Sequence, residues 1–137
     1  MGMELNNICL SAGDHLTFKG LILPDAQRFQ FDLGSSSNDL AFHFNPRFHD
    51  DDDGAVLICN SKCDGCWGDE KRESHNPLKQ GEEVKIVLKF TGDMFKVELP
   101  GGQTVEFPNR EGASFISYVS VKGDLQISSF KIKNNAY

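Results

Sequence analysis

The chain has 137 residues, of which 39% are hydrophobic and 25% charged, and its formal net charge is −6. This length and composition predict one globular domain over residues 1–137, large enough to bury a core of its own. The negative balance, without any basic block, argues against nucleic acid or an anionic membrane surface as a partner.

The first residues, MGMELNNICLSAGD, have neither a basic start nor a long apolar core. They therefore predict neither a signal peptide nor a membrane-spanning segment. We expect a cytoplasmic protein that does not insert into membranes.

Short segments in which apolar residues alternate with polar ones follow this start, separated by turn residues. A period of two is typical of strands with one buried face, and no segment sustains a 3.6-residue apolar period. The chain also contains 11 Phe residues, which favour strands. The pattern predicts an all-β, antiparallel β-sandwich. The alternating segments are residues 15–20, 28–33, 39–45, 55–60, 83–90, 94–99, 103–107 and 117–132.

The last of these segments contains a change of phase. Leu125 and Ile127 share one parity, whereas Phe130 and Ile132 share the other. A β-bulge near residues 128–129 would reconcile the two halves. Alternatively, this strand buries one face against the core and the other against a partner subunit.

Polar side chains with directional hydrogen bonds gather between residues 43 and 72. His43, Asn45 and Arg47 occupy alternate positions, so one strand face would present an imidazole, an amide and a guanidinium to solvent. The only Trp, Trp67, follows among glycines and acidic residues, which predicts an exposed aromatic plate. Each residue alone has an ordinary structural explanation, but the set suits a sugar, which has hydroxyls on its rim and C–H bonds on its face.

The order of these residues resembles the signature of galectins, the β-galactoside-binding animal lectins. H-x-N-P-R is followed by an apolar-C-N-S strand and then by W-G-x-E-x-R, and the segments PDAQRFQFDLG and VEFPNREG also look like galectin segments. The resemblance implies a two-sheet jelly roll with a sugar site that needs no metal or cofactor. It implies the carbohydrate-binding residues His43, Asn45, Arg47, Asn60, Trp67, Glu70 and Arg72, with Asp53 and Ile58 as candidate accessory residues.

The resemblance also implies a role for each group. His43, Asn45 and Arg47 would bind the axial 4-hydroxyl of galactose, and the equatorial epimer would leave them unpaired at a cost of about 1–3 kcal/mol. The less polar face of the sugar would stack on Trp67, and Asn60 would bind the 6-hydroxyl.

Two expectations concern Glu70. In galectins the acid at this position reaches the 6-hydroxyl, and it and the following Arg reach the next sugar. We expect Glu70 to lie between Arg47 and Arg72 and to hold both guanidinium groups in place. It is also the only carboxylate that we place firmly in the site, whereas a glycosidase normally needs two. The chain is therefore not expected to be an enzyme.

The partners implied are β-galactoside glycans of glycoproteins and glycolipids, such as lactose and N-acetyllactosamine. Binding to a shallow groove would be weak, with a Kd on the order of 10⁻³–10⁻⁵ M, so crosslinking needs more than one site. One-domain galectins commonly pair through terminal strands, and we expect a homodimer with contacts from Leu5, Ile8, Phe130 and Ile132. The resemblance also implies non-classical secretion from the cytoplasm to the extracellular space.

Four cysteines leave two alternatives open. Cys59, Cys63 and Cys66, flanked by His49 and His75, offer ligands for a zinc-binding module. Alternatively, Cys63 and Cys66 form a reversible disulfide just before the only Trp, as in a redox-responsive galectin-fold protein with little sugar binding.

Residues 49–53, a His followed by a run of four acids at 50–53, stand where galectins often carry N-A-H-G-D or D-A-H-G-D. The run of acids lacks the ligand spacing of a calcium-binding loop, and we interpret it as a solvated loop. A purely structural galectin-fold protein is a further alternative. Such relatives typically lose site residues, whereas this chain has all seven.

Overall fold

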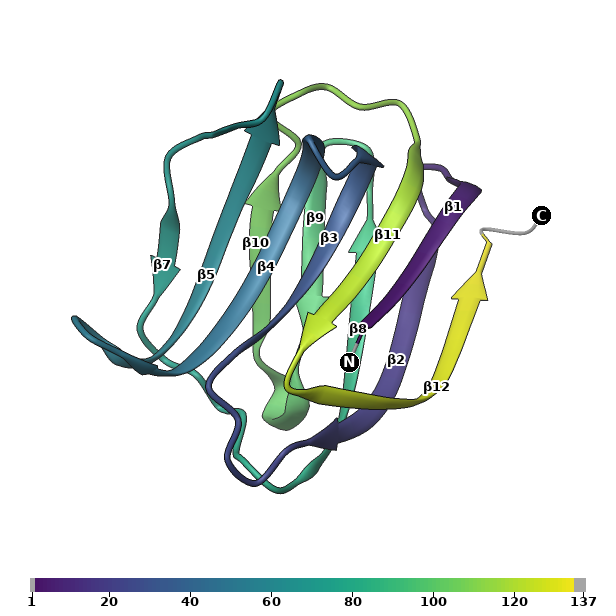
Figure 1. The fold of residues 1–137 in the computed structure, drawn as a ribbon. Helices are drawn as coiled ribbons and strands as arrows, with labels where there is room; N and C mark the ends of the chain where they lie inside the picture. Colours follow the sequence, from purple (N-terminus) through teal and green to yellow (C-terminus); the bar gives the residue numbers. More distant parts are fainter. Residues whose placement is uncertain (1, 135–137) are drawn as a thin grey trace.

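Two antiparallel sheets packed face to face make up the protein, as Figure 1 shows for a computed structural model that describes residues 2–134. A single turn of 3-10 helix, Pro100–Gly102, precedes β10 (Thr104–Pro108), an edge strand of the smaller sheet. No helix among residues 2–134 has the length and apolar character needed to cross a membrane. The predicted all-β sandwich is confirmed.

The larger sheet has the order β1-β11-β3-β4-β5, and two short strands, β6 and β7, both pair with β5. Its strands are β1 (Gly2–Leu10), β11 (Ile116–Gly123), β3 (Phe29–Ser36), β4 (Asp39–Asp50), β5 (Gly54–Cys63), β6 (Cys66–Trp67) and β7 (Lys71–Glu73).

The smaller sheet has the order β10-β9-β8-β2-β12. Its strands are β10 (Thr104–Pro108), β9 (Met94–Glu98), β8 (Glu83–Phe90), β2 (His15–Ile22) and β12 (Leu125–Lys133). The register of β12 against β2 shifts between Ile127 and Ser129, which confirms the predicted bulge.

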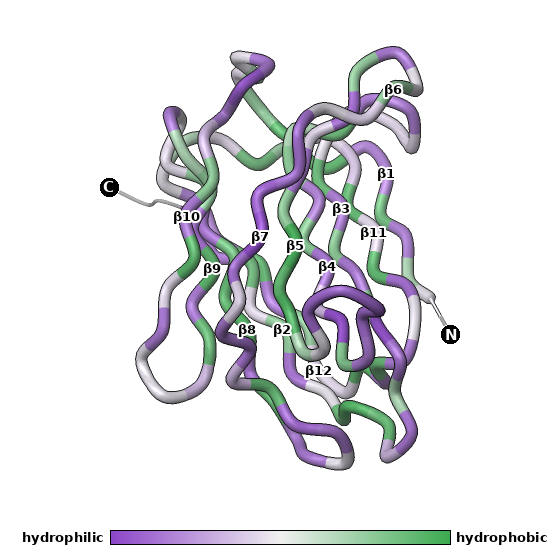
Figure 2. The backbone as a smooth tube through the Cα atoms, turned by 90° about the vertical axis from the view of Figure 1, so that its left-hand side faces the viewer, coloured by the Kyte–Doolittle hydropathy of each residue, from purple (hydrophilic) through white to green (hydrophobic). Residues whose placement is uncertain are grey.

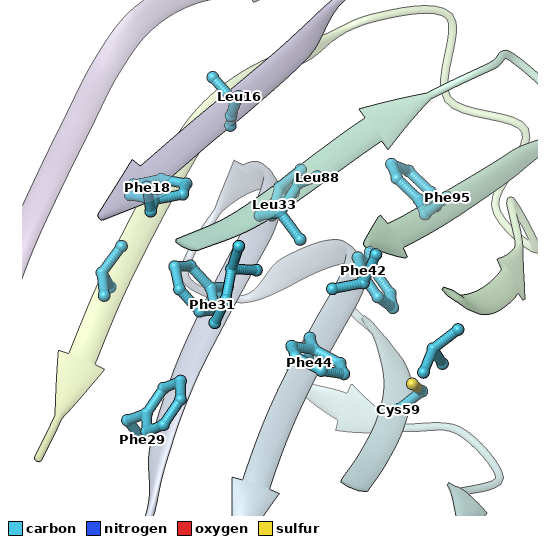
Figure 3. Close-up of a cluster of buried hydrophobic side chains, with 14 of the residues drawn as sticks. Leu16, Phe18, Phe29, Phe31, Leu33, Phe42, Phe44, Cys59, Leu88 and Phe95 are labelled. Carbon is cyan, nitrogen blue, oxygen red and sulfur yellow. The ribbon is translucent and has the colours of Figure 1, made fainter. Parts of the chain in front are cut away.

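Phenylalanine side chains fill the space between the sheets, as Figure 3 shows for residues of β2, β3, β4 and β9. The Phe42 ring lies 5.2 Å from the Phe95 ring at an interplanar angle of 11°, and the Phe18 ring lies 4.8 Å from the Phe31 ring. Each of these four rings is at most 1% exposed. Burial of such rings is the main favourable contribution to the free energy of folding.

The outer face of the larger sheet is where polar residues of β4 and β5 gather. Because strand side chains alternate between faces, the burial of Phe42 and Phe44 inside the sandwich places His43 and Asn45 outside it. Val56 and Ile58 of β5 are at most 1% exposed but do not belong to the core between the sheets. They are therefore buried beneath the polar residues of this outer face. Figure 2 shows the hydrophilic strand β7 beside the largely hydrophobic β5.

The edge strands β1 and β12 lie on the same side of the sandwich, opposite the side that carries β5 and β7 (Figure 1). Each pairs with one neighbour within the described residues, β1 with β11 and β12 with β2. Strands of this kind present unpaired backbone groups.

Candidate carbohydrate-binding site

A cleft of about 320 Å³ lies over β4 and the loop between β6 and β7. Six of the seven predicted binding residues line it, and the exception, Arg72, is hydrogen-bonded to one of the six, Glu70. Sequence reasoning missed three further lining residues, two on or next to β3 and one in the loop. The lining consists of Arg28, Gln30, His43, Asn45, Arg47, Asn60, Trp67, Gly68 and Glu70.

His43 is held from both sides. Its Nδ1 lies 2.5 Å from Oδ1 of Asp32, the residue opposite it on β3, and Gln30 donates to the other oxygen of Asp32 at 2.7 Å. Because a carboxylate only accepts hydrogen bonds, Nδ1 carries the proton and Nε2 remains for another partner. The imidazole centroid lies 4.6 Å from that of Trp67.

The side chain of Asn45 contacts both the backbone of β3 and the side chain of Arg47 on its own strand. Its Nδ2 donates to the carbonyl of Phe29 at 2.8 Å, and its Oδ1 accepts from Nε of Arg47 at 2.9 Å. The predicted common face of His43, Asn45 and Arg47 is therefore confirmed.

The predicted exposure to solvent is wrong for His43 and Asn45, whereas Arg47 is partly exposed. His43 is 8% and Asn45 2% exposed, and the side chain of Arg47 is 24% exposed. Asp32 and Trp67 lie against His43, and Asp50 lies against Arg47.

Asp50, not Glu70, joins the two arginines. Its Oδ1 accepts from Nη1 of Arg47 at 2.9 Å, and its Oδ2 accepts from Nη1 of Arg72 at 3.0 Å. Glu70 pairs with Arg72 alone, at 3.2 Å from Nε. The predicted position of Glu70 between the arginines is wrong, because the last residue of β4 brings a nearer carboxylate to both.

The electrostatics of this cluster favour full ionisation. Hydrogen bonds from Arg72 and Arg47 lower the pKa of Asp50 to about 2. The same contact with Asp50, together with a hydrogen bond to Asp53, raises the pKa of Arg72. Asp53 lies 2.8 Å from Nη1 of Arg72, so it supports the cluster from outside the cleft. The side chain of Asp50 is only 10% exposed, which limits screening of its two ion pairs by water.

Asn60 is positioned by the loop that follows Trp67. Its Nδ2 donates to the carbonyl of Gly68 at 3.0 Å, and its Oδ1 accepts from Nη1 of Arg110 at 3.4 Å. Arg110 also donates to the carbonyl of Asp69 at 2.8 Å. A Cβ added to Gly68 would meet Nη1 of Arg110 at 3.0 Å, so glycine leaves the space through which this side chain passes.

Trp67 is 50% exposed, which confirms the predicted open indole. It stands opposite Lys62 in the β5–β6 hairpin, and Nζ of Lys62 lies 4.9 Å from its ring centroid. Ile58, one of the candidate accessory residues, is buried on the floor of the sheet and does not line the cleft.

The residues of the zinc alternative are not brought together. Cys59 is 1% exposed and belongs to the core, as Figure 3 shows, and burial raises the pKa of its thiol to about 12. The one group of three close metal-ligand atoms in the described part of the chain is Asp39, Cys63 and Asp64, which includes none of the predicted histidines. In the loop at 50–53, Asp50 and Asp53 form ion pairs, and their partners are arginines.

A polar cleft beside a half-exposed indole, on the outer face of a β-sandwich, suits a ligand with both hydroxyl groups and an apolar face, as a carbohydrate has. The family model of the galactoside-binding lectin matches residues 3–132, so the chain belongs to that family. Its relatives are lectins rather than enzymes, in agreement with the prediction of a non-catalytic protein.

The relatives are similar over nearly the whole chain. Human galectin-2 is 40% identical over 131 residues, covering 96% of this chain and 96% of the relative. The structure of CG-16, a homodimeric agglutinin from chicken liver, matches with a TM-score of 0.93 at 38% identity, over 97% of this chain and 100% of that one. The structure of a toad ovary galectin in complex with thio-digalactose matches with a TM-score of 0.91 at 30% identity, over 96% and 98%.

Proposed function

We propose that this protein binds β-galactosides, such as lactose and N-acetyllactosamine, in the cleft beside Trp67, without a metal ion. The observation that carries the proposal is the fixed row of His43, Asn45 and Arg47 next to a half-exposed indole. The complex of a related toad galectin with thio-digalactose supports the choice of sugar.

The hydrogen bonds already made within this row leave one complementary set of groups for a hydroxyl. His43 retains Nε2, Asn45 retains one amide N–H, and Arg47 retains Nη2. A hydroxyl has one proton to donate and two lone pairs to accept with. With the ring proton on Nδ1, the hydroxyl would donate to Nε2 of His43 and accept from the other two residues, which is the set that we assign to the axial 4-hydroxyl.

The same assignment predicts that a sugar with the 4-hydroxyl in the equatorial position binds more weakly. An equatorial hydroxyl points away from the three groups, so a bound glucoside would bury their free donors and acceptor without partners. Leaving buried polar groups unpaired costs about 1–3 kcal/mol, or roughly 5- to 150-fold in affinity. The stacked indole adds affinity for both epimers and therefore does not distinguish them.

We further propose that two copies of the chain associate through the edge strands β1 and β12. Leu5, Ile8 and Phe130 pack partly against the core, and Ile132 is 39% exposed. Because these edges lie opposite the side that carries β5 and β7, a two-fold pair would hold its clefts far apart, as crosslinking requires. The homodimeric chicken agglutinin supports this arrangement. Sedimentation at high micromolar concentration tests it, and a monomer there would contradict it.

The experiment for the sugar assignment is a calorimetric titration with N-acetyllactosamine in the presence and absence of EDTA. We expect a Kd on the order of 10⁻³–10⁻⁵ M, unchanged by the chelator. Loss of binding in EDTA would show that a metal ion takes part. Absence of heat at millimolar sugar in both buffers would reject the proposal.

A further inference from the structure

Two exposed cysteines are paired in register at the end of the hairpin that carries Trp67. Cys63 and Cys66 are directly opposite residues of β5 and β6, and both are exposed. The turn between them consists of Asp64 and Gly65, with φ of 50° and 79°. Positive φ at both central residues is typical of a tight two-residue hairpin, which keeps the flanking residues adjacent.

This register pairing is compatible with the Cα separation of a disulfide. Directly opposite residues of antiparallel strands have Cα atoms roughly 4.5–5.5 Å apart, and disulfides join Cα atoms that are roughly 4.4–6.8 Å apart. The hairpin therefore does not need to change register to form the bond. The turn is also fixed in place, because the N–H groups of Asp64 and Gly65 donate to Asp39 and to the carbonyl of Asn38, each at 2.9 Å.

The other two cysteines are not competitors within one molecule. Cys59 is buried in the core, where its thiol has a pKa of about 12. Cys9 is exposed on β1, at the opposite edge of the larger sheet from β6. Within one molecule, Cys66 is therefore the thiol nearest in register that is available to Cys63.

The acidic surroundings of Cys63 make its thiol a slow nucleophile. The hydrogen bond and negative charge of Glu111, with further charge from Asp64 and Asp39, raise the pKa of the Cys63 thiol. A thiol that holds its proton attacks disulfides slowly, because the thiolate is the reactive form.

The bond would lie next to the sugar site. Register pairs within β5 and β6 are Cys63 with Cys66 and Lys62 with Trp67, so the indole follows directly on one of the two cysteines. We propose that Cys63 and Cys66 form a reversible redox site, and that its disulfide holds the β5–β6 hairpin closed and Trp67 in its binding position. The consequence for affinity rests on the proposed function of the cleft. A preorganised indole loses less freedom on binding, so we expect tighter sugar binding in the oxidised protein.

The chemistry requires a small-molecule disulfide such as oxidised glutathione. One protein thiolate attacks a sulfur of this disulfide, forming a mixed disulfide and releasing one glutathione thiolate, which takes up a proton. The second protein thiolate then attacks the protein sulfur of the mixed disulfide and displaces the second glutathione. Two protein thiols become one disulfide, and one oxidised glutathione becomes two reduced molecules.

The test uses the full chain with Cys9→Ser, which removes the third exposed thiol. After incubation with oxidised glutathione, thiol counting and peptide mass analysis should show a Cys63–Cys66 bond, with no glutathione retained and full reversal by dithiothreitol. Acrylamide quenching of Trp67 fluorescence should fall on oxidation, and lactose should bind roughly 2- to 5-fold more tightly. Cys9→Ser/Cys63→Ser/Cys66→Ser is the matched control, because it cannot form the mixed disulfide at the hairpin, and it should bind lactose equally well with and without the oxidant.

Retained glutathione, or two free thiols after oxidation, would overturn the disulfide. Unchanged quenching, or lactose affinity that is equal or weaker in the oxidised protein, would overturn the effect on Trp67. Failure of the proposed function is separate from both results. In that case the reduced protein does not bind lactose, while the thiol count still decides the bond and acrylamide quenching still decides the position of the indole.

Discussion

Asp50, the last residue of β4, accepts a hydrogen bond from Arg72 of β7 at 3.0 Å while it also binds Arg47 on its own strand. The two guanidinium groups, which come from strands on either side of β5, are therefore fixed by one carboxylate. Charge-assisted hydrogen bonds of this kind are shorter and stronger than neutral ones and restrict both side chains to one orientation.

Replacing Asp50 by Asn should weaken lactose binding on the order of ten-fold, because the amide cannot accept equally well from two guanidinium groups. Calorimetric titration measures the effect. Asp52→Asn is the matched control, because Asp52 is exposed and contacts Asp50 only through its backbone N–H. Equal affinities of the two variants would show that Asp50 does not position the arginines.

The ion pairs of Asp50 should also make the free energy of unfolding depend on pH in the acid range. The pKa of Asp50 is lowered to about 2 in the folded state, below its ordinary value of 3.8. Folding therefore favours the charged form, so the stabilising contribution of Asp50 is present above about pH 4 and is lost as pH falls through about 2. The difference in free energy of unfolding between the native protein and Asp50→Asn, from urea titrations, should shrink over this interval. A difference that stays constant down to about pH 2 would contradict the assignment.

Trp67→Leu should weaken sugar binding by about 1–2 kcal/mol through the loss of stacking and burial, and it should leave the unfolding midpoint nearly unchanged, since half of the indole is exposed. Phe115→Leu provides the comparison, because Phe115 is 55% exposed and does not line the cleft. Calorimetry and thermal unfolding of both variants separate the two effects. Full lactose affinity of Trp67→Leu would place the sugar elsewhere.

Arg110→Lys should weaken lactose binding by roughly three- to ten-fold, because a single ammonium group cannot replace the forked contacts to Asn60 and to the carbonyl of Asp69. The variant retains the positive charge, so a loss of lactose affinity would show that the forked hydrogen bonds of Arg110 matter rather than its charge. Lys85→Arg, at an exposed position of β8 on the other sheet, should have no effect. Calorimetric titration of both variants decides whether Arg110 positions the site.

Cys59→Ser should lower the free energy of unfolding by about 1–3 kcal/mol, because it places a hydroxyl in an apolar core. Cys9→Ser, at an exposed position, should stay within about 0.5 kcal/mol. In the reduced native protein the exposed thiols of Cys9, Cys63 and Cys66 should react with a thiol reagent, and that of Cys59 only after denaturation. Rapid reaction of Cys59 in the native state would contradict its place in the core.

The fold was predictable wherever the pattern of alternation was regular. Phe29, Phe31 and Leu33 mark β3 because these alternate positions all carry large apolar side chains that enter the core. Strand β1 lacks such a pattern, since Asn7 has a φ of 60° and the register against β11 shifts between Asn6 and Leu10. Its formation depends on pairing with a strand more than a hundred residues later, which local sequence does not indicate.

The parts of the site that depend on residue spacing along a single strand were predictable from the sequence. Spacing places His43, Asn45 and Arg47 on one face, but the contact of Asp50 with Arg72 depends on the register of β7 against β5. The departure of the loop at 50–53 from the N-A-H-G-D pattern was the available signal for Asp50. Arg110 follows β10 of the other sheet, and the resemblance of VEFPNREG to a galectin segment did not assign it a role.

The most direct test of the account is the fluorescence of Trp67 during titration with lactose and with cellobiose, which differ only in the configuration of one hydroxyl. Because Trp67 is the only Trp of the chain, the signal reports the cleft alone. Lactose should change the emission and saturate with a Kd on the order of 10⁻³–10⁻⁵ M, while cellobiose should bind at least several-fold more weakly. Equal binding of the two disaccharides, or no response to lactose, would contradict the assignment of the row of His43, Asn45 and Arg47 to the axial hydroxyl.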